Sequence, residues 1–310
     1  MKYKDWLAEW LNNYVLPSSK DKTFMRYSDI VRQHLVPKLG ELELEELSPL
    51  IVQRFIADIL QTGNLKTGKG LSANSVNTII TVIQGSMSTA HMIGLTDSYE
   101  MNKLKRPKQQ EKSVECFTPQ EQKMIEQAVL SDRRDKMKGI VLCLYTGLRI
   151  GELLALEWND IDFSKAELTV SKTCHDSKNE DGSFCRITET PKTTHSKRVI
   201  PLPKQLLPLL RESKKSSSST LVVSSKEAKP ISIRSYQRSF ELLQQKIGID
   251  HRGFHALRHT FATRAIECGM DVKSLSEILG HKNPTVTLNR YVHSLMEHKR
   301  AMMDKIGKIF

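Results

Sequence analysis

The sequence predicts a mainly helical protein with a small antiparallel β-sheet, arranged as a helical N-terminal domain followed by an α+β domain. In the first hundred residues, apolar side chains recur every three or four positions, as they do along one face of a helix. Between residues 161 and 202, short segments instead alternate apolar and polar residues, as strands of a half-buried sheet do. The length of 310 residues gives each of two domains room for its own core.

Three segments of the N-terminal region are predicted helices. They cover residues 3–16, 48–60 and 72–94. In the first, Trp6 and Trp10 stand four positions apart on the apolar face. The second begins with Ser48 as its predicted N-cap and with Pro49 at the first helical position. The third ends at Gly94, a residue type that commonly stops a helix.

A change in composition marks the boundary between the two domains. The segment "NKLKRPKQQEKS" is polar and basic, contains a proline and has no apolar periodicity, which is typical of an interdomain linker. We therefore expect a helical domain, a linker, a second domain and a C-terminal tail. These cover residues 1–105, 106–115, 116–292 and 293–310.

The second domain begins with a predicted helix cap. Thr118 precedes a proline, and Glu121 falls at the capping-box position. An apolar helix over residues 137–158 follows, broken at Gly147. The strands come next, with residues 171–183 forming an extended hairpin or loop between the first two of them. After a serine-rich surface loop at residues 213–220, helices resume and continue to the C-terminus.

The charge of the chain indicates a polyanionic partner. Lys and Arg number 47 against 35 Asp and Glu, which gives a net charge of +12. Basic residues spread over both domains favour a long polyanion, DNA or RNA, although many basic proteins bind neither. The five cysteines form no C-x-x-C pair, which favours a reducing cytoplasm. No signal peptide and no apolar run near the ~20 residues of a membrane helix is present, so we expect a soluble protein without a membrane partner.

The stretch "FHALRHTFATRAIECG" carries two histidines and an arginine in one and a half turns of a predicted helix. His255 and His259 stand four apart, as in H-E-x-x-H zinc sites. The position of the catalytic glutamate is taken by Ala256, however, and Arg258 lies between the histidines, where its charge would oppose a divalent metal. A guanidinium flanked by imidazoles suits a phosphate instead. We therefore expect an anion site, with neither metal nor cofactor.

Further polar residues elsewhere in the second domain match such a site. Arg149 and Glu152 are three apart, just after the glycine break, while Lys192 lies in a polar turn between two predicted strands. His281 follows a glycine that stops a helix, and Tyr291 lies on the next short helix. Each has an ordinary alternative, namely a surface ion pair, a hairpin charge, a helix cap and one tyrosine among seven. Their joint occurrence in this order favours a common site.

These residues and their local sequences resemble the tyrosine recombinases, also called phage integrases. The resemblance covers residues 118–292 and, more loosely, the N-terminal domain, where "QHLVPKLGELELEELSP" is similar to the helical core-binding domain of that family. The segment before Lys192 is similar to that of integrases from phages and conjugative transposons. The matching motifs are Arg149 in "TGLRIGEL", Lys192 in "PKTTHSKRVIPL", His255 and Arg258 in "HALRHTFAT", His281 in "LGH", and Tyr291.

The resemblance implies a site-specific recombinase that integrates and excises a mobile element. Tyr291 would attack a DNA phosphodiester to give a 3′-phosphotyrosyl link and a free 5′-hydroxyl, a transesterification that needs neither ATP nor metal. Arg149 and Arg258 would stabilise charge on the non-bridging oxygens, and Lys192 would protonate the leaving 5′ oxygen. The partners implied are double-stranded DNA and further copies of the chain, four in a synaptic tetramer.

The remaining site residues have supporting roles by the same resemblance. His255 would assist proton movement at the tyrosine, and His281 would hydrogen-bond the phosphate. Glu152 would orient His255 and Arg149, and His259 is expected to be structural.

Two alternatives use the same residues. One is a type IB topoisomerase-like relaxing enzyme, and the other is a DNA-binding regulator without activity. An additional arm-binding domain, carried by many integrases before the core-binding domain, is expected to be absent or removed. The tail at residues 293–310 either packs on its own domain or docks on a neighbouring protomer.

Overall fold

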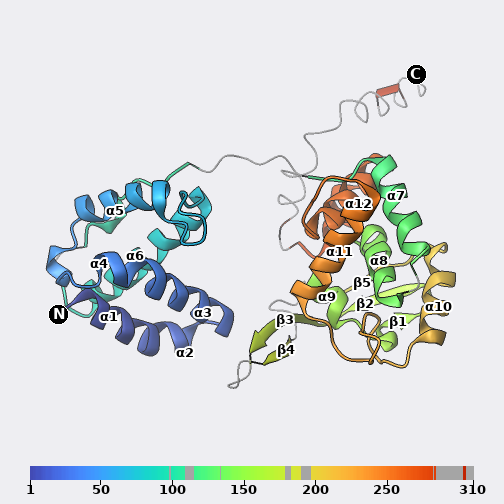
Figure 1. The fold of residues 1–310 in the computed structure, drawn as a ribbon, viewed down its shortest axis with the longest axis horizontal. Coiled ribbons are helices and arrows are strands. Elements are labelled where there is room, and N and C mark those ends of the chain that lie inside the picture. Colours follow the sequence, from blue (N-terminus) through green and yellow to red (C-terminus); the bar gives the residue numbers. More distant parts are fainter. Residues whose placement is uncertain are drawn as a thin grey trace. The chain divides into compact units, whose positions relative to one another are not determined.

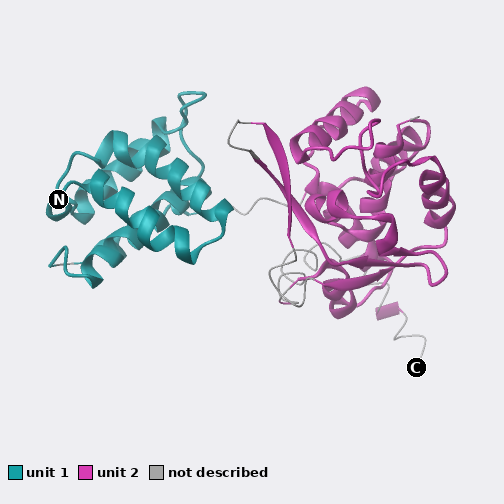
Figure 2. Ribbon diagram, turned by 90° about the horizontal axis from the view of Figure 1, so that it is seen from below, with its two compact units in different colours: residues 1–112 teal, residues 113–310 magenta. Residues whose placement is uncertain are grey.

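The computed structural model describes residues 1–97, 99–108, 115–132, 134–178, 183–189, 197–281, 283 and 303–304. The chain forms two compact units, Met1–Lys112 and Ser113–Phe310, which Figure 2 draws in teal and magenta. The predicted fold class is confirmed, since both units are mainly helical and the second also carries small antiparallel sheets. None of the helices within these ranges combines the length and the apolar character that crossing a membrane requires.

Unit 1 is a group of helices around one apolar core. Its elements are α1 (Tyr3–Trp10), η1 (Leu11–Val15), α2 (Leu16–Ser18), α3 (Asp21–Ile30), η2 (Val31–Leu35), α4 (Val36–Leu39), η3 (Leu44–Glu46), α5 (Pro49–Thr62), α6 (Ala73–Met92) and η4 (Met101–Lys103). The π-helical turns η1 and η2 each end two residues before a proline. Proline has no N–H and its ring crowds the preceding turn, which accounts for the widened turn at both places.

The core of unit 1 is tied together by buried polar contacts to α6. Tyr3 and Trp6 of α1 are almost fully buried. The Tyr3 hydroxyl lies 2.9 Å from Oγ of Ser86, and Trp6 Nε1 donates to the Ser86 carbonyl at 3.0 Å. The predicted N-cap at Ser48 is confirmed, because its hydroxyl accepts from the Ile51 amide.

Unit 2 combines seven α-helices with five strands among its described residues. The helices are α7 (Pro119–Leu130), α8 (Lys138–Thr146), α9 (Ile150–Ala155), α10 (Leu206–Ser216), α11 (Ile233–Ile247), α12 (His255–Glu267) and α13 (Val272–Leu279), with short turns η5 (Asp135–Met137) and η6 (Trp158–Asp160). The strands are β1 (Ile161–Asp162), β2 (Glu167–Val170), β3 (Thr173–Lys178), β4 (Phe184–Glu189) and β5 (Arg198–Pro201).

Two antiparallel sheets replace the single sheet expected from the sequence. One has the strand order β1-β2-β5, and the other is the hairpin β3-β4. The segment after β2, which the sequence left open as hairpin or loop, therefore enters a hairpin. The prediction of a serine-rich loop at residues 213–220 is wrong at its start, because α10 continues to Ser216. Within it, the hydroxyls of Ser213 and Ser216 donate to carbonyls of the preceding turn.

The helix pair at the centre of unit 2 is α8 and α12, which lie side by side (Figure 1). Almost every side chain of α8 is buried, since neighbouring elements cover it on all faces. The predicted break at Gly147 is confirmed, with α8 ending at Thr146 and Gly147 in the left-handed region at φ 66°. A Cβ at this glycine would lie 2.6 Å from the Phe261 ring of α12. Only glycine therefore allows both the turn and the close packing.

Candidate active site

The predicted polar residues of the site that fall in the described ranges lie at the start of α9, on α12 and just after the end of α13. The structure describes Arg149, Glu152, His255, Arg258 and His281. The other two candidates, Lys192 and Tyr291, lie outside the described residues.

Arg149 and Glu152 form the start of α9. Arg149 is the N-cap residue, and Oε2 of Glu152 accepts a hydrogen bond from its backbone amide at 2.9 Å. The Arg149 guanidinium also binds Glu152, with 2.8 Å between Nη1 and Oε1. The sequence allowed a surface ion pair as the alternative, but this pair is half buried, because the Glu152 side chain is 6% exposed and that of Arg149 is 38% exposed.

Arg258 lies on α12 and is 1% exposed. Its Nη1 donates to the Gly147 carbonyl at 2.7 Å, and its Nη2 donates to the Leu279 carbonyl at 2.7 Å. Both acceptors are carbonyls at the C-terminal ends of helices, where no intrahelical N–H is left to bind them. One guanidinium therefore fixes the ends of α8 and α13 against each other.

His281 follows the end of α13. Gly280 caps this helix in the left-handed region at φ 62°, and the His281 amide returns to the Ser276 carbonyl at 3.0 Å. This turn brings His281 Nε2 to 2.9 Å from Nη2 of Arg258. It also presents the Gly280 carbonyl to Nη2 of Arg149 at 3.2 Å. Arg149 and Arg258 therefore both contact the turn formed by residues 279–281.

The histidines at the start of α12 form a pair of their own. The rings of His255 and His259 pack edge to face, with centroids 4.5 Å apart. The sequence also predicts that Glu152 orients His255. Within the described part of the chain, the hydrogen bonds of Glu152 go to Arg149 and to a third arginine instead.

That third arginine, Arg198, was missed by the sequence analysis. It is the first residue of β5, and its side chain is 6% exposed. Its guanidinium holds both carboxylate oxygens of Glu152, at 3.0 and 2.8 Å. A signal was present in the sequence, because the strand alternation places Arg198 on the same buried face as Ile200, where a charged residue needs a partner.

The electrostatics of this cluster favour anions. Burial raises the pKa of the Glu152 carboxyl, but the guanidinium groups of Arg198 and Arg149 outweigh it and lower the pKa to about 2. Glu152 is therefore ionised at neutral pH and shared between two arginines. Together with Arg258, these groups can bind an anion through several N–H donors, as phosphate requires.

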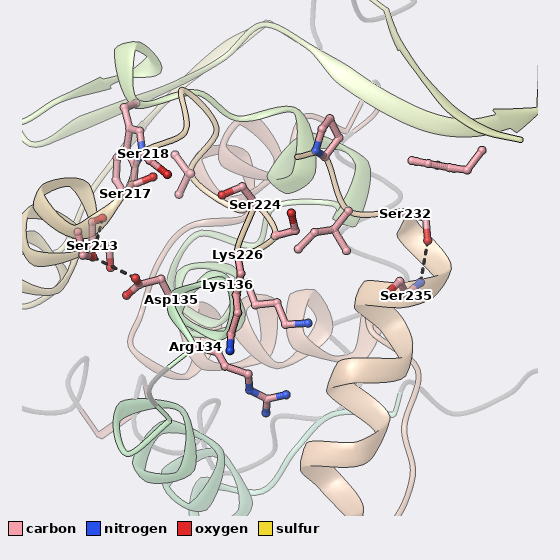
Figure 3. A pocket seen from close by; sticks show the side chains of 17 residues that line it. Arg134, Asp135, Lys136, Ser213, Ser217, Ser218, Ser224, Lys226, Ser232 and Ser235 are labelled. Carbon is pink, nitrogen blue, oxygen red and sulfur yellow. Dashed lines mark hydrogen bonds between the residues drawn. The ribbon is translucent and has the colours of Figure 1, made fainter. Parts of the chain in front are cut away.

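A pocket of about 710 Å³ lies elsewhere in unit 2 (Figure 3). Its lining includes Arg134, Lys136 and Lys226 together with serines of α10, α11 and the segment between them. None of the five site residues that the structure describes lines it. The described part of the candidate active site is thus a cluster of largely buried donors that is separate from this pocket.

Comparisons with known proteins agree with the predicted resemblance. The model of the Phage integrase family matches residues 115–298, and that of the Phage integrase, N-terminal SAM-like domain matches residues 2–60. A "Tyrosine recombinase XerC-like" protein of Caldanaerobacter subterraneus subsp. tengcongensis is 30% identical, over 99% of this chain and 83% of its own length. The ICEBs1 integrase of Bacillus subtilis is 25% identical, over 94% of this chain and 79% of its own.

Solved structures show the same fold. The Tn1549 transposon integrase in complex with a circular intermediate DNA superposes with a TM-score of 0.81 at 21% identity, and covers 99% of both chains. A lambda integrase dimer bound to a COC′ core site gives a TM-score of 0.70 at 20% identity, with 92% of this chain and 97% of that chain covered.

Proposed function

This chain belongs to the phage integrase family, and from that premise we propose that its site cuts and rejoins DNA through Tyr291. It is a tyrosine recombinase, an enzyme of site-specific DNA recombination that serves a mobile element. One observation carries the assignment of the site. Arg149 and Arg258, 109 positions apart in sequence, both donate to the backbone of residues 279–280, beside His281.

The proposed chemistry is an exchange of esters at one phosphorus atom. The phenol oxygen of Tyr291 attacks, the bond from phosphorus to the 5′ oxygen breaks, and a 3′-phosphotyrosyl link forms. The phenol loses its proton with the help of His255, and Lys192 gives a proton to the departing 5′ oxygen. A 5′-hydroxyl from a second strand then reverses these steps and restores an intact backbone.

Negative charge builds up on the non-bridging oxygens in the transition state. Stabilising this charge is the main way in which the protein can lower the activation free energy. Arg149 and Arg258 supply fixed cations with paired N–H donors, and His281 adds a further hydrogen bond. Burial of Arg258 makes this arrangement rigid before DNA arrives, so little reorganisation accompanies the reaction. These donors take the role that a metal ion has in other phosphoryl-transfer enzymes.

The partner in this proposal is double-stranded DNA. Residues 1–105 would form the core-binding domain, 106–115 the linker and 116–292 the catalytic domain. A lambda integrase tetramer bound to a Holliday junction has the same fold, at a TM-score of 0.72. We place four copies of this chain around two duplexes, with the tail at 293–310 exchanged between protomers. Deleting residues 294–310 tests the exchange, because tetramers on DNA should then be lost.

The cytoplasm is the proposed compartment, with the protein on the nucleoid when bound. The five cysteines, all within the described residues, are free thiols, which suits a reducing environment. The topoisomerase and the inactive regulator are not favoured. The curated relatives are named recombinases, integrases and transposases, and the anion site has its described residues in place.

The test of function is strand exchange on a defined site. Sites are first selected from random duplex DNA by binding to the protein. Two duplexes with a selected site are then incubated with it, and recombinant products are expected without ATP. Relaxation of supercoiled plasmid without recombinants would indicate a topoisomerase, and binding without either product would indicate a regulator.

A further inference from the structure

We propose that Arg198 is a positioning residue of this site, which holds Glu152 and the end of α13 so that Arg149 keeps its charge for the phosphate. The inference rests on the proposed function and concerns a residue outside the predicted site. Arg198 begins β5, where its backbone pairs with Val170 of β2. Its side chain reaches from the sheet into the cluster of arginines.

The contacts of Arg198 join three separate elements. Two guanidinium nitrogens bind both oxygens of Glu152 on α9, at 3.0 and 2.8 Å. The third, Nε, donates to the Ile278 carbonyl in the last turn of α13 at 2.5 Å. One side chain therefore sets the positions of β5, α9 and α13, and α13 leads directly to His281.

Gly280 shows how closely Arg198 approaches the site. A Cβ built on this glycine would lie 3.0 Å from Nη1 and 3.2 Å from Cδ of Arg198. The same glycine offers its carbonyl to Arg149. The guanidiniums of Arg149 and Arg198 thus both contact the Glu152 carboxylate and both approach the turn at Gly280, so a shift of one would displace the other.

The positive charge of Arg198 also offsets the negative charge of Glu152. A carboxylate 2.8 Å from a single guanidinium cancels most of the field that this guanidinium exerts on an anion. Glu152 is shared by two guanidiniums, so the group of Arg149, Glu152 and Arg198 carries two positive charges and one negative. Arg198 therefore offsets Glu152, and Glu152 can hold Arg149 in place without neutralising it.

Arg198 also lies close in sequence to the proposed general acid. It follows Lys192 by six residues. Fixing the first residue of β5 against α9 and α13 fixes one end of the segment that carries Lys192. A displaced strand would move this end relative to the arginines, and reaction rates are sensitive to about 1 Å of such displacement.

The experiment measures single-turnover cleavage of a nicked duplex at saturating DNA for the wild type and Arg198→Met. Each is tested on a normal phosphodiester and on a methylphosphonate, in which one charged oxygen is replaced by a neutral methyl group. We expect cleavage of the phosphodiester to fall about 100-fold in Arg198→Met, with the Kd for DNA within about threefold of wild type. On the methylphosphonate, the deficit should shrink to less than about tenfold, because less charge has to be stabilised.

The matched control is Arg252→Met. Arg252 forms an ion pair of 2.7 Å with Glu121 in the same unit, and its guanidinium lies over the Phe117 ring. This variant loses a comparable ion pair away from the cluster, so its cleavage rate should stay at the wild-type value. Arg198→Lys should cleave at an intermediate rate, because it retains the charge but not the planar fork.

The variant Arg198→Met leaves Glu152 with one guanidinium in a buried place and is prone to unfold. The double variant Arg198→Met, Glu152→Gln removes both charges, so the role of Arg198 can still be tested if the single variant does not fold. If Arg198 acts through Glu152, the double variant should cleave no more slowly than Arg198→Met.

Three results would overturn the inference. They are wild-type cleavage by Arg198→Met, an equal deficit of Arg198→Met on both substrates, and a deficit of the double variant equal to the product of those measured for Arg198→Met and for Glu152→Gln alone. Absence of cleavage by the wild type on every selected site would instead overturn the proposed function itself, and the inference with it.

Discussion

Nη2 of Arg258 lies 2.9 Å from Nε2 of His281, although the two residues are 23 positions apart in the chain. A guanidinium only donates hydrogen bonds, so the imidazole nitrogen facing it accepts one, and its proton is on Nδ1. The contact joins α12 to the turn after α13. It supports the proposal that both side chains bind the same phosphate, which would compete with His281 for the Arg258 donors.

Replacing Arg258 with lysine should reduce catalysis far more than DNA binding. An ammonium cannot reach the Gly147 and Leu279 carbonyls together, so donors to the phosphate are lost. We expect single-turnover cleavage to fall by about 100- to 1000-fold, while the Kd for DNA changes little.

The control for this variant is Arg264→Lys, on the same helix. Arg264 donates to the Phe117 carbonyl at 2.9 Å and pairs with Glu267, away from the site. Its cleavage rate should match the wild type. An equal loss in both variants would show that Arg258 is only structural.

Gly280→Ala should lower both stability and cleavage. Its φ of 62° lies in the left-handed region, which costs about 1 kcal/mol for alanine. The new Cβ would also press on Arg198 and displace the carbonyl that binds Arg149. We expect cleavage to fall about tenfold or more.

Gly248→Ala provides a matched control for the backbone strain. This glycine caps α11 at φ 71°, and a Cβ there would meet nothing within 4 Å. Thermal unfolding should show a similar loss of stability in both variants. Cleavage should fall in Gly280→Ala alone, and a parallel fall in Gly248→Ala would contradict the role given to the turn at Gly280.

The sequence predicted the fold well where local chemistry decides it. Thr118 and Glu121 form the expected capping box, and Gly147 breaks the helix at the expected place. Cap residues bind backbone groups within one helical turn, so a helix end can be predicted from residues that are adjacent in the sequence. The helix α3 (Asp21–Ile30) was not assigned from the sequence, and none of its residues is fully buried.

The candidate site was predicted only in part, for a physical reason. Motifs identified Arg149, Arg258 and His281, which the structure brings together. Pairing between distant residues cannot be read from spacing. Glu152 was expected to contact Arg149 and His255, and the structure shows Arg149 together with Arg198 of β5 instead of His255. The predictions for Lys192 and Tyr291 still stand as predictions, since both residues lie outside the described ranges.

The stability contributed by Glu152 should depend on pH in a defined direction. Despite burial, the arginines lower the pKa of its carboxyl from 4.5 to about 2, so the folded state favours the ionised form. Its contribution is fully present above the unfolded value of 4.5 and is lost as pH falls towards 2. Glu152→Gln should therefore destabilise the protein by about 3–5 kcal/mol at pH 7, and by less at pH 3.

Urea unfolding of the wild type and Glu152→Gln at pH 7, 5, 4 and 3 measures this difference. Other lowered carboxyls, such as Asp132 with a pKa of about 2, are the same in both proteins and cancel in the comparison. A difference that stays constant from pH 7 to pH 3 would show that the ionisation of Glu152 does not stabilise the cluster.

DNA binding should weaken steeply with salt. The net charge of +12 and the proposed contacts along the duplex imply release of several counterions. For six or more phosphate contacts, a plot of log K against log salt should have a slope of about −5 or steeper. Fluorescence anisotropy between 50 and 300 mM salt measures it, and a flat response would contradict an extended phosphate interface.

The most direct test of the central claim is covalent trapping on a nicked suicide duplex that carries a selected site. The broken strand diffuses away after attack, so the protein–DNA link accumulates and is resolved on a denaturing gel. The wild type should form it, and peptide mass spectrometry should locate the phosphate on Tyr291. Tyr291→Phe should bind DNA with nearly unchanged affinity and form no link, whereas a link in that variant, or one mapped to another residue, would contradict the account.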